Sequence, residues 1–210
     1  MATTPTATSA ALSILLAVVG YVSTALHTLR SQQHKGRVDR VGEQLKEFYG
    51  PLLACVTTSK SSYDAMLRHA AESLQGGDVM TPAQFRAAVR ADAKGPVAQC
   101  YRTWVREVLL PLSDKASRLV VQRADLLEGS SIEPLLLQLV AHASALKVLV
   151  RRWDQGDGEY SSCGIAYPDE LRTWAEAAFV RLKRRQSELL GISSDGRQGS
   201  PLMRVLASKL

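Results

Sequence analysis

The sequence predicts an all-α protein with an N-terminal transmembrane helix, followed by an antiparallel helical bundle whose helices are kinked at proline. Three observations lead to this fold class. An uncharged, apolar stretch precedes Arg30, which is the first charged residue of the chain. Beyond it, apolar residues recur three or four positions apart, the spacing of a helix with one buried face. No segment shows the strict alternation of apolar and polar residues that is typical of a half-buried strand.

The predicted transmembrane helix covers residues 10–29. A bilayer core about 30 Å thick requires roughly 20 apolar residues in a helix. The preceding residues 1–9 contain no basic side chain, which argues against a cleaved signal peptide. We expect residues 1–9 to be disordered. The alternative to a membrane helix is a helix buried on all sides in a soluble core.

The basic residues that follow predict the orientation of this helix. Segments rich in Lys and Arg stay on the cytoplasmic side of a membrane, and they attract anionic lipid. Residues 30–37 are therefore predicted to form a basic juxtamembrane linker with a polar hinge at 31–36, and the following domain is predicted to face the cytosol. The candidate interaction residues here are Arg30, Lys35, Arg37 and Arg40.

Residues 38–191 are predicted to form the bundle, as one domain large enough to bury a core of its own. Its first apolar stripe consists of Val41, Leu45, Phe48, Leu52 and Val56. Proline lacks a backbone donor and clashes with the carbonyl four residues earlier, so Pro51 predicts a kink or a break in this helix. Pro111 predicts a second one, because it interrupts a stripe formed by Val97, Cys100, Tyr101, Trp104, Val105, Val108 and Leu112.

Capping residues predict where two further helices begin. Thr81 and Gln84 match a capping box with Pro82 in the first turn. Ser130 and Glu133 match a second capping box. It precedes the segment 135–150, which is apolar nearly all round and is expected to be the central helix of the bundle.

The last helix is predicted to start within the segment Tyr167-Pro168-Asp169-Glu170, because proline and acidic residues suit a first helical turn. Its end is predicted at Gly191. The remaining residues 192–210 are rich in Ser and Gly and are expected to be a flexible tail.

Composition narrows the function classes. The three cysteines, Cys55, Cys100 and Cys163, are odd in number and widely spaced, which argues against a disulfide framework. The net charge of +6 permits nucleic-acid binding, but few aromatic residues are available to stack on bases. We therefore expect no nucleic-acid partner.

No catalytic, cofactor-binding or metal-binding motif is present in the sequence. The four histidines are not spaced to share a metal on one helix, and no phosphate-binding glycine loop occurs. His142 lies on the apolar segment 135–150 and is the candidate buried polar residue. These observations favour a non-enzymatic protein without a cofactor.

Two further segments carry candidate functional residues. A basic run on the last helix supplies the candidate interaction residues Arg181, Lys183, Arg184 and Arg185, whose alternative role is a solvated outer face. The chain ends with Ser208, Lys209 and Leu210, a tripeptide that a receptor reads as a peroxisomal address when it stands at a C-terminus.

Several short segments resemble an uncharacterised family of helical proteins that often have a single N-terminal membrane span. The resemblance is carried by Phe48-Tyr-Gly-Pro-Leu52, Trp104-Val-Arg-Glu-Val-Leu-Leu-Pro-Leu112, Ala124-Asp-Leu-Leu-Glu128, Ala141-His142, Arg152-Trp153 and Tyr167-Pro168. It implies a fold type and no known activity. This chain has Ser113 where similar chains carry Asn.

The sequence thus favours a membrane-anchored helical interaction or scaffold module that contacts the lipid bilayer, including anionic lipid, and an unidentified protein. The alternative is an enzyme or small-ligand carrier with a site between bundle helices, near His142, Tyr101 and Trp104. A closed apolar core near His142 favours the first hypothesis, and a cavity with convergent polar groups favours the second.

Overall fold

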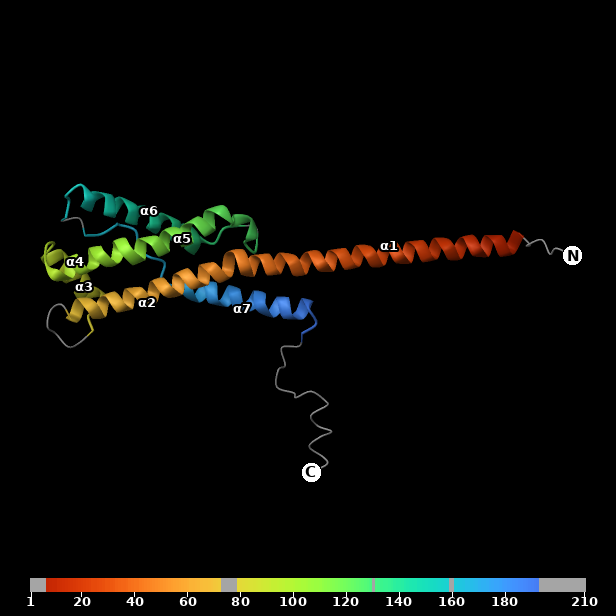
Figure 1. The fold of residues 1–210 in the computed structure, drawn as a ribbon, viewed down its shortest axis with the longest axis horizontal. Helices are drawn as coiled ribbons and strands as arrows, with labels where there is room; N and C mark the ends of the chain where they lie inside the picture. Colours follow the sequence, from red (N-terminus) through yellow and green to blue (C-terminus); the bar gives the residue numbers. More distant parts are fainter. Residues whose placement is uncertain (1–6, 73–78, 130, 159–160, 193–210) are drawn as a thin grey trace, which may run out of the picture. The chain divides into compact units, whose positions relative to one another are not determined.

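The computed structural model describes residues 7–72, 79–129, 131–158 and 161–192, and its regular elements there are all helical (Figure 1). Five helices pack as a bundle, which confirms the predicted fold class. The chain forms two compact units: a terminal unit, Met1–Gly42 with Arg184–Leu210, and a bundle unit, Glu43–Lys183. In chain order, the elements are α1 (Ala7–Glu43), η1 (Gln44–Tyr49), α2 (Gly50–Glu72), α3 (Pro82–Ala91), α4 (Pro96–Trp104), η2 (Val105–Leu109), α5 (Leu110–Gln122), η3 (Ala124–Leu126), α6 (Pro134–Asp154) and α7 (Leu171–Leu189).

Each of the two prolines that predicted a kink follows a π turn. η1 and η2 are π-helical, and they end two residues before Pro51 and Pro111. The N–H of Gly50 donates to the carbonyl of Leu45, five residues earlier, and η2 closes with the equivalent bond. The chain therefore widens its helix just before each proline and stays helical through it, instead of breaking.

The predicted start of α3 is confirmed, whereas that of α6 is not. The side chain of Thr81 accepts a hydrogen bond from the Gln84 N–H, and the Gln84 side chain accepts one from the Thr81 N–H, so the capping box is formed. α6 starts at Pro134 with Glu133 in the N-cap position and no side-chain cap, so the predicted start at Ser130 was wrong. Proline at the first helical position fixes φ and needs no donor, which explains the later start.

The core of the bundle unit forms where α5 packs against both α2 and α6. Phe48, Tyr49 and Leu52 are among its largest fully buried side chains. The prediction that the apolar segment 135–150 is surrounded by other helices was wrong, because Leu137 and Val148 on α6 are exposed. α6 packs on the bundle with one face only, through Leu136, Leu139, Ala143, Leu146, Leu149 and Trp153.

α7 begins at Leu171, a little later than predicted. Its buried face consists of Leu171, Ala175, Ala178 and Leu182.

The predicted hinge at 31–36 was wrong, because these residues lie inside α1. The segment contains a single glycine and no proline, and its polar side chains tolerate a helix, so nothing in it stops the helix. α1 also starts at Ala7, so residues 7–9, which we expected to be disordered, are helical. Within the terminal unit, a Cβ atom at Gly42 would meet the Gln186 side chain at 3.8 Å, which places the end of α7 beside this part of α1.

Candidate functional site

The large apolar side chains of α1 between Leu12 and Leu29 are exposed and do not pack against another element. The exposed fractions of its large apolar residues range from 47% at Val22 to 77% at Tyr21. In the described part of the chain, two helices are long and apolar enough to cross a membrane, one at the N-terminus and the other α6. None of the apolar window in the N-terminal helix is buried, whereas 28% of that in α6 is. α1 is therefore the candidate membrane anchor or signal helix.

The structure separates the predicted basic residues into two groups. Arg30, Lys35, Arg37 and Arg40 are exposed on α1, and Arg184 and Arg185 are exposed at the end of α7, all in the terminal unit. Arg181 and Lys183 belong to the bundle unit. Arg181 pairs with Glu128 at 2.7 Å, so it already has a partner within the chain.

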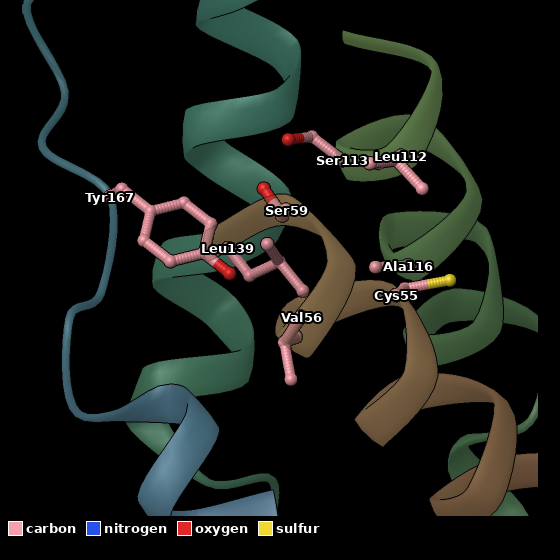
Figure 2. Close-up of a pocket in the computed structure, with 8 residues that line it drawn as sticks. All are labelled: Cys55, Val56, Ser59, Leu112, Ser113, Ala116, Leu139 and Tyr167. Atoms are coloured by element: carbon pink, nitrogen blue, oxygen red, sulfur yellow. The ribbon is translucent and has the colours of Figure 1, made fainter. Parts of the chain in front are cut away.

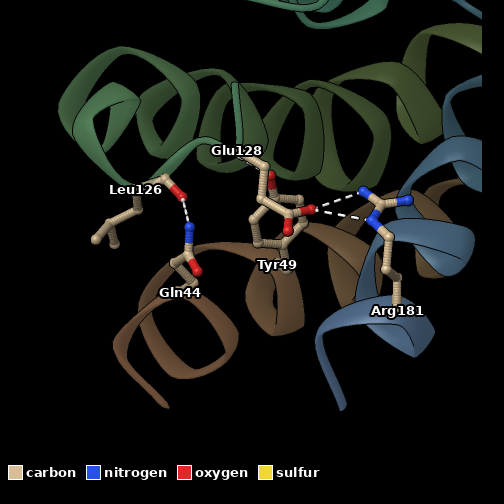
Figure 3. Close-up of polar contacts among 5 residues, drawn as sticks. All are labelled: Gln44, Tyr49, Leu126, Glu128 and Arg181. Carbon is tan, nitrogen blue, oxygen red and sulfur yellow. Dashed lines mark hydrogen bonds and ion pairs between the residues drawn. The ribbon is translucent and has the colours of Figure 1, made fainter. Parts of the chain in front are cut away.

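Figure 3 shows that this ion pair is part of a polar cluster where η1 meets the connection between α5 and α6. Gln44 is buried, and its Nε2 donates to the carbonyl of Leu126 at 2.9 Å. The N–H of Glu128 donates to the hydroxyl of Tyr49 at 3.1 Å. Burial raises the pKa of Tyr49, so its hydroxyl stays neutral at ordinary pH. The cluster fixes the connection to η1, a structural role that the sequence patterns did not indicate.

His142, the candidate buried polar residue, is half-buried, and its partners come from the segment before α7. Its Nδ1 donates to the carbonyl of Ile165 at 2.7 Å, and its ring meets that of Tyr167 edge to face. Burial lowers the pKa of His142, and the hydrogen bond to Ile165 offsets part of that effect. The imidazole therefore holds the segment against α6 in its neutral form.

The thiol of Cys163 lies 3.8 Å from this Nδ1, but the arrangement does not suit thiol activation. Because Nδ1 carries the proton that it donates to Ile165, it cannot accept one from the thiol. The thiol itself contacts the same carbonyl, at 3.2 Å. All three cysteines are unpaired, and Cys100 is buried, as expected for a small core residue.

The three residues named for an alternative ligand site do not face one cavity. Tyr101 packs its ring edge to face with Phe85 and Trp153. The Nε1 of Trp104 donates to Nδ1 of His69 at 3.2 Å, whereas His142 donates to Ile165. Tyr101 and Trp104 pack against the same apolar cluster, while the hydrogen bonds of Trp104 and His142 go to separate residues.

Two hollows among the described residues are small. The first has an empty volume of about 140 Å³, open solvent included. Figure 2 shows the residues that line it, which are Cys55, Val56, Ser59, Leu112, Ser113, Ala116, Leu139 and Tyr167. Burial raises the pKa of the Tyr167 hydroxyl to about 12, and the neighbouring hydroxyl of Ser59 offsets part of that effect. A second hollow, of about 180 Å³ with open solvent included, lies beside Tyr101 and Arg102. The guanidinium of Arg102 donates hydrogen bonds to the carbonyls of Ala93 and Gly158. Neither of the two has room for a water molecule, whereas sites for small molecules typically enclose about 300–1,000 Å³.

Among the described residues, no group of three or more His, Cys, Asp or Glu side chains is placed to hold a metal ion. The contacts that organise the loops, such as those of Arg102, Glu128 and His142, join residues more than 20 positions apart, except for that of Arg102 with Ala93. Such pairs leave no signal in local spacing, which is why sequence patterns missed them. Ser208, Lys209 and Leu210 lie outside the described residues.

Three comparisons with known proteins complete this description. No family model, curated protein or solved structure matches the chain.

Proposed function

We propose that this protein is a membrane-anchored helical interaction module, in which α1 crosses a bilayer and the bundle unit binds an unidentified protein. The observation that carries the proposal is the apolar surface of α1, which is exposed all round and has no charged residue before Arg30. Water-exposed surface of this kind is unfavourable, and a bilayer is the partner whose thickness fits its length.

The basic residues after the apolar segment support an orientation. Arg30, Lys35 and Arg37 follow it directly, which favours a cytosolic bundle and an N-terminus on the other side of the membrane. The small cavities and the engaged side chains near His142 support a scaffold over an enzyme or ligand carrier.

Carbonate extraction of membranes from cells that express the chain with an N-terminal fluorescent tag tests the anchor. We expect the wild-type protein to stay in the membrane fraction. The variant Leu15→Arg/Val19→Arg should be released, because each Arg near the centre of a membrane helix costs about 2.5–3.5 kcal/mol. The matched control is Leu137→Arg/Val148→Arg, which alters the exposed apolar face of α6.

The outcome of this pair identifies the anchor. Release of the α6 variant but not of the α1 variant would assign the membrane helix to α6, and release of the wild-type protein would contradict membrane anchoring. Protease treatment of sealed vesicles tests the orientation, since a cytosolic bundle is digested while the N-terminal tag is protected. Deletion of Ser208, Lys209 and Leu210 tests the peroxisomal address, which predicts loss of the protein from peroxisomes.

A further inference from the structure

The net charge of the protein belongs entirely to the terminal unit. Residues 43–183 contain seventeen basic and seventeen acidic side chains, so the bundle unit is neutral. Residues 1–42 and 184–210 contain nine basic and three acidic side chains, which accounts for the whole charge of +6. The same unit contains the exposed apolar segment of α1. Basic charge and apolar surface therefore occur together and are not spread over the molecule.

The structure brings the end of α7 beside the basic part of α1. Gln186 lies next to Gly42, and α7 runs from there back along α1 toward its N-terminal end (Figure 1). At about 1.5 Å per residue, Gly42 stands about 20 Å beyond Leu29, and Leu189, the last residue of α7, about 15 Å beyond it. The headgroup layer of a bilayer is roughly 5–8 Å thick on each side. With Leu29 at the edge of the hydrocarbon, the end of α7 thus lies about 7–10 Å outside that layer, which is about one Debye length.

The side chains on this surface are available for an external partner. Arg30, Lys35, Arg37, Arg184 and Arg185 have no ion pair with any other residue in the described segments. Leu190 and Ile192, at the end of α7, are 51% and 59% exposed. In the bundle unit, by contrast, several arginines form ion pairs with carboxylates, namely Arg106, Arg118, Arg123 and Arg181.

We infer that these residues form a basic collar, made by both ends of the chain, that attracts anionic phospholipid to the bilayer around α1. The collar consists of Arg30, Lys35, Arg37, Arg184 and Arg185, with Leu190 and Ile192 at its membrane-facing edge. The inference rests on the proposed function, because the collar needs α1 in a bilayer. It keeps the anionic lipid expected from the sequence, and what it adds is the participation of α7, whose Arg184 stands 147 residues after Arg37.

Distance from the bilayer ranks the contributions. Lys35 and Arg37 lie about 9 and 12 Å beyond Leu29, so their long side chains reach the headgroups. Arg184 and Arg185 lie more than 20 Å beyond it, at the level of Gly42 and above, where a Debye length of about 8–10 Å weakens their attraction. A basic residue at the surface raises the association constant for anionic lipid about fivefold. We therefore expect a strong contribution from the α1 residues and a weaker one from the α7 pair.

The test measures lipid selectivity of the full-length protein in reconstituted vesicles. Electron paramagnetic resonance of spin-labelled phosphatidylserine and phosphatidylcholine gives the ratio of their association constants with the protein. Lys35→Glu/Arg37→Glu should lower the preference for phosphatidylserine at least fivefold, and Arg184→Glu/Arg185→Glu about twofold. Arg86→Glu/Arg90→Glu on α3 makes the same charge change in the bundle unit and should leave the ratio unchanged.

The outcomes separate the collar from the anchor. A wild-type protein without preference for phosphatidylserine, or an α7 variant that behaves like the α3 control, overturns the inference even if carbonate does not extract the protein. Release by carbonate contradicts the proposed function instead. Circular dichroism of each variant checks the fold, and Arg184→Gln/Arg185→Gln, which removes charge without reversing it, should show about half the effect of the Glu pair.

Discussion

Glycine at position 50 is predicted to be irreplaceable by alanine, although it lies in a helix with ordinary helical dihedral angles. In a helix interior, Gly→Ala normally stabilises a protein by about 0.5–1 kcal/mol. At Gly50, a Cβ atom would lie 2.7 Å from the carbonyl oxygen of Leu45. The π turn places this carbonyl, five residues earlier, beside Gly50, where an α-helix would place the carbonyl four residues earlier. The opposing atom belongs to the backbone, so it cannot rotate away.

The expected magnitude follows from three contributions. Overpacking costs about 1–3 kcal/mol, and weakening the hydrogen bond between the Gly50 N–H and Leu45 costs about 1 kcal/mol more. The helical preference of alanine returns about 1 kcal/mol. We therefore expect Gly50→Ala to lower the free energy of unfolding by about 1–3 kcal/mol.

Gly42→Ala is the matched control, because its Cβ would meet only the Gln186 side chain, at an ordinary 3.8 Å. This variant should be stabilised by about 0.5–1 kcal/mol. Urea unfolding of residues 37–191, followed by far-UV circular dichroism, measures both. A Gly50→Ala protein as stable as the wild type, beside a stabilised Gly42→Ala protein, would refute the role assigned to the π turn.

Three further predictions concern stability. Tyr49→Phe should lower the free energy of unfolding in urea by about 1–3 kcal/mol, because it leaves the N–H of Glu128 unpaired. Arg181→Ala should lower it by less than about 1 kcal/mol, because its ion pair is partly exposed, and a larger loss for Arg181→Ala than for Tyr49→Phe would contradict this ranking. Thr81→Ala should cost about 0.5–2 kcal/mol through loss of the capping box, and unchanged amide exchange in α3 would argue against it. The pKa of His142 is lowered in the folded state, so its contribution to stability is present above the unfolded value near 6.5 and is lost as pH falls through the folded value; His142→Gln should flatten the fall of stability with decreasing pH below about 6.5.

The sequence allowed the helices to be predicted well where a rule depends on neighbouring residues. Thr81 with Pro82 located the start of α3, and the positions of Pro51 and Pro111 located the two disturbances in the long helices. The proline rule did not predict that a π turn precedes each proline. A kink, a break and a widened turn all satisfy a proline, so the proline alone does not determine which of them forms.

Features that depend on distant residues were missed. The segment 135–150 is apolar all round, but how many helices cover α6 is decided by the path of the rest of the chain. The partners of His142 are contributed by the segment before α7, and that of Arg181 by the connection between α5 and α6. The hinge at 31–36 failed for a different reason, since polar residues alone do not end a helix.

The separation of charge between the two units also affects how the protein behaves in solution. Proteins with a net charge near zero tend to associate and precipitate. A proteolytic fragment confined to residues 43–183 has no net charge near neutral pH, whereas the whole chain is cationic. Colloidal stability of the bundle therefore depends on residues outside it, and such a fragment will pass through a cation exchanger that retains the intact protein.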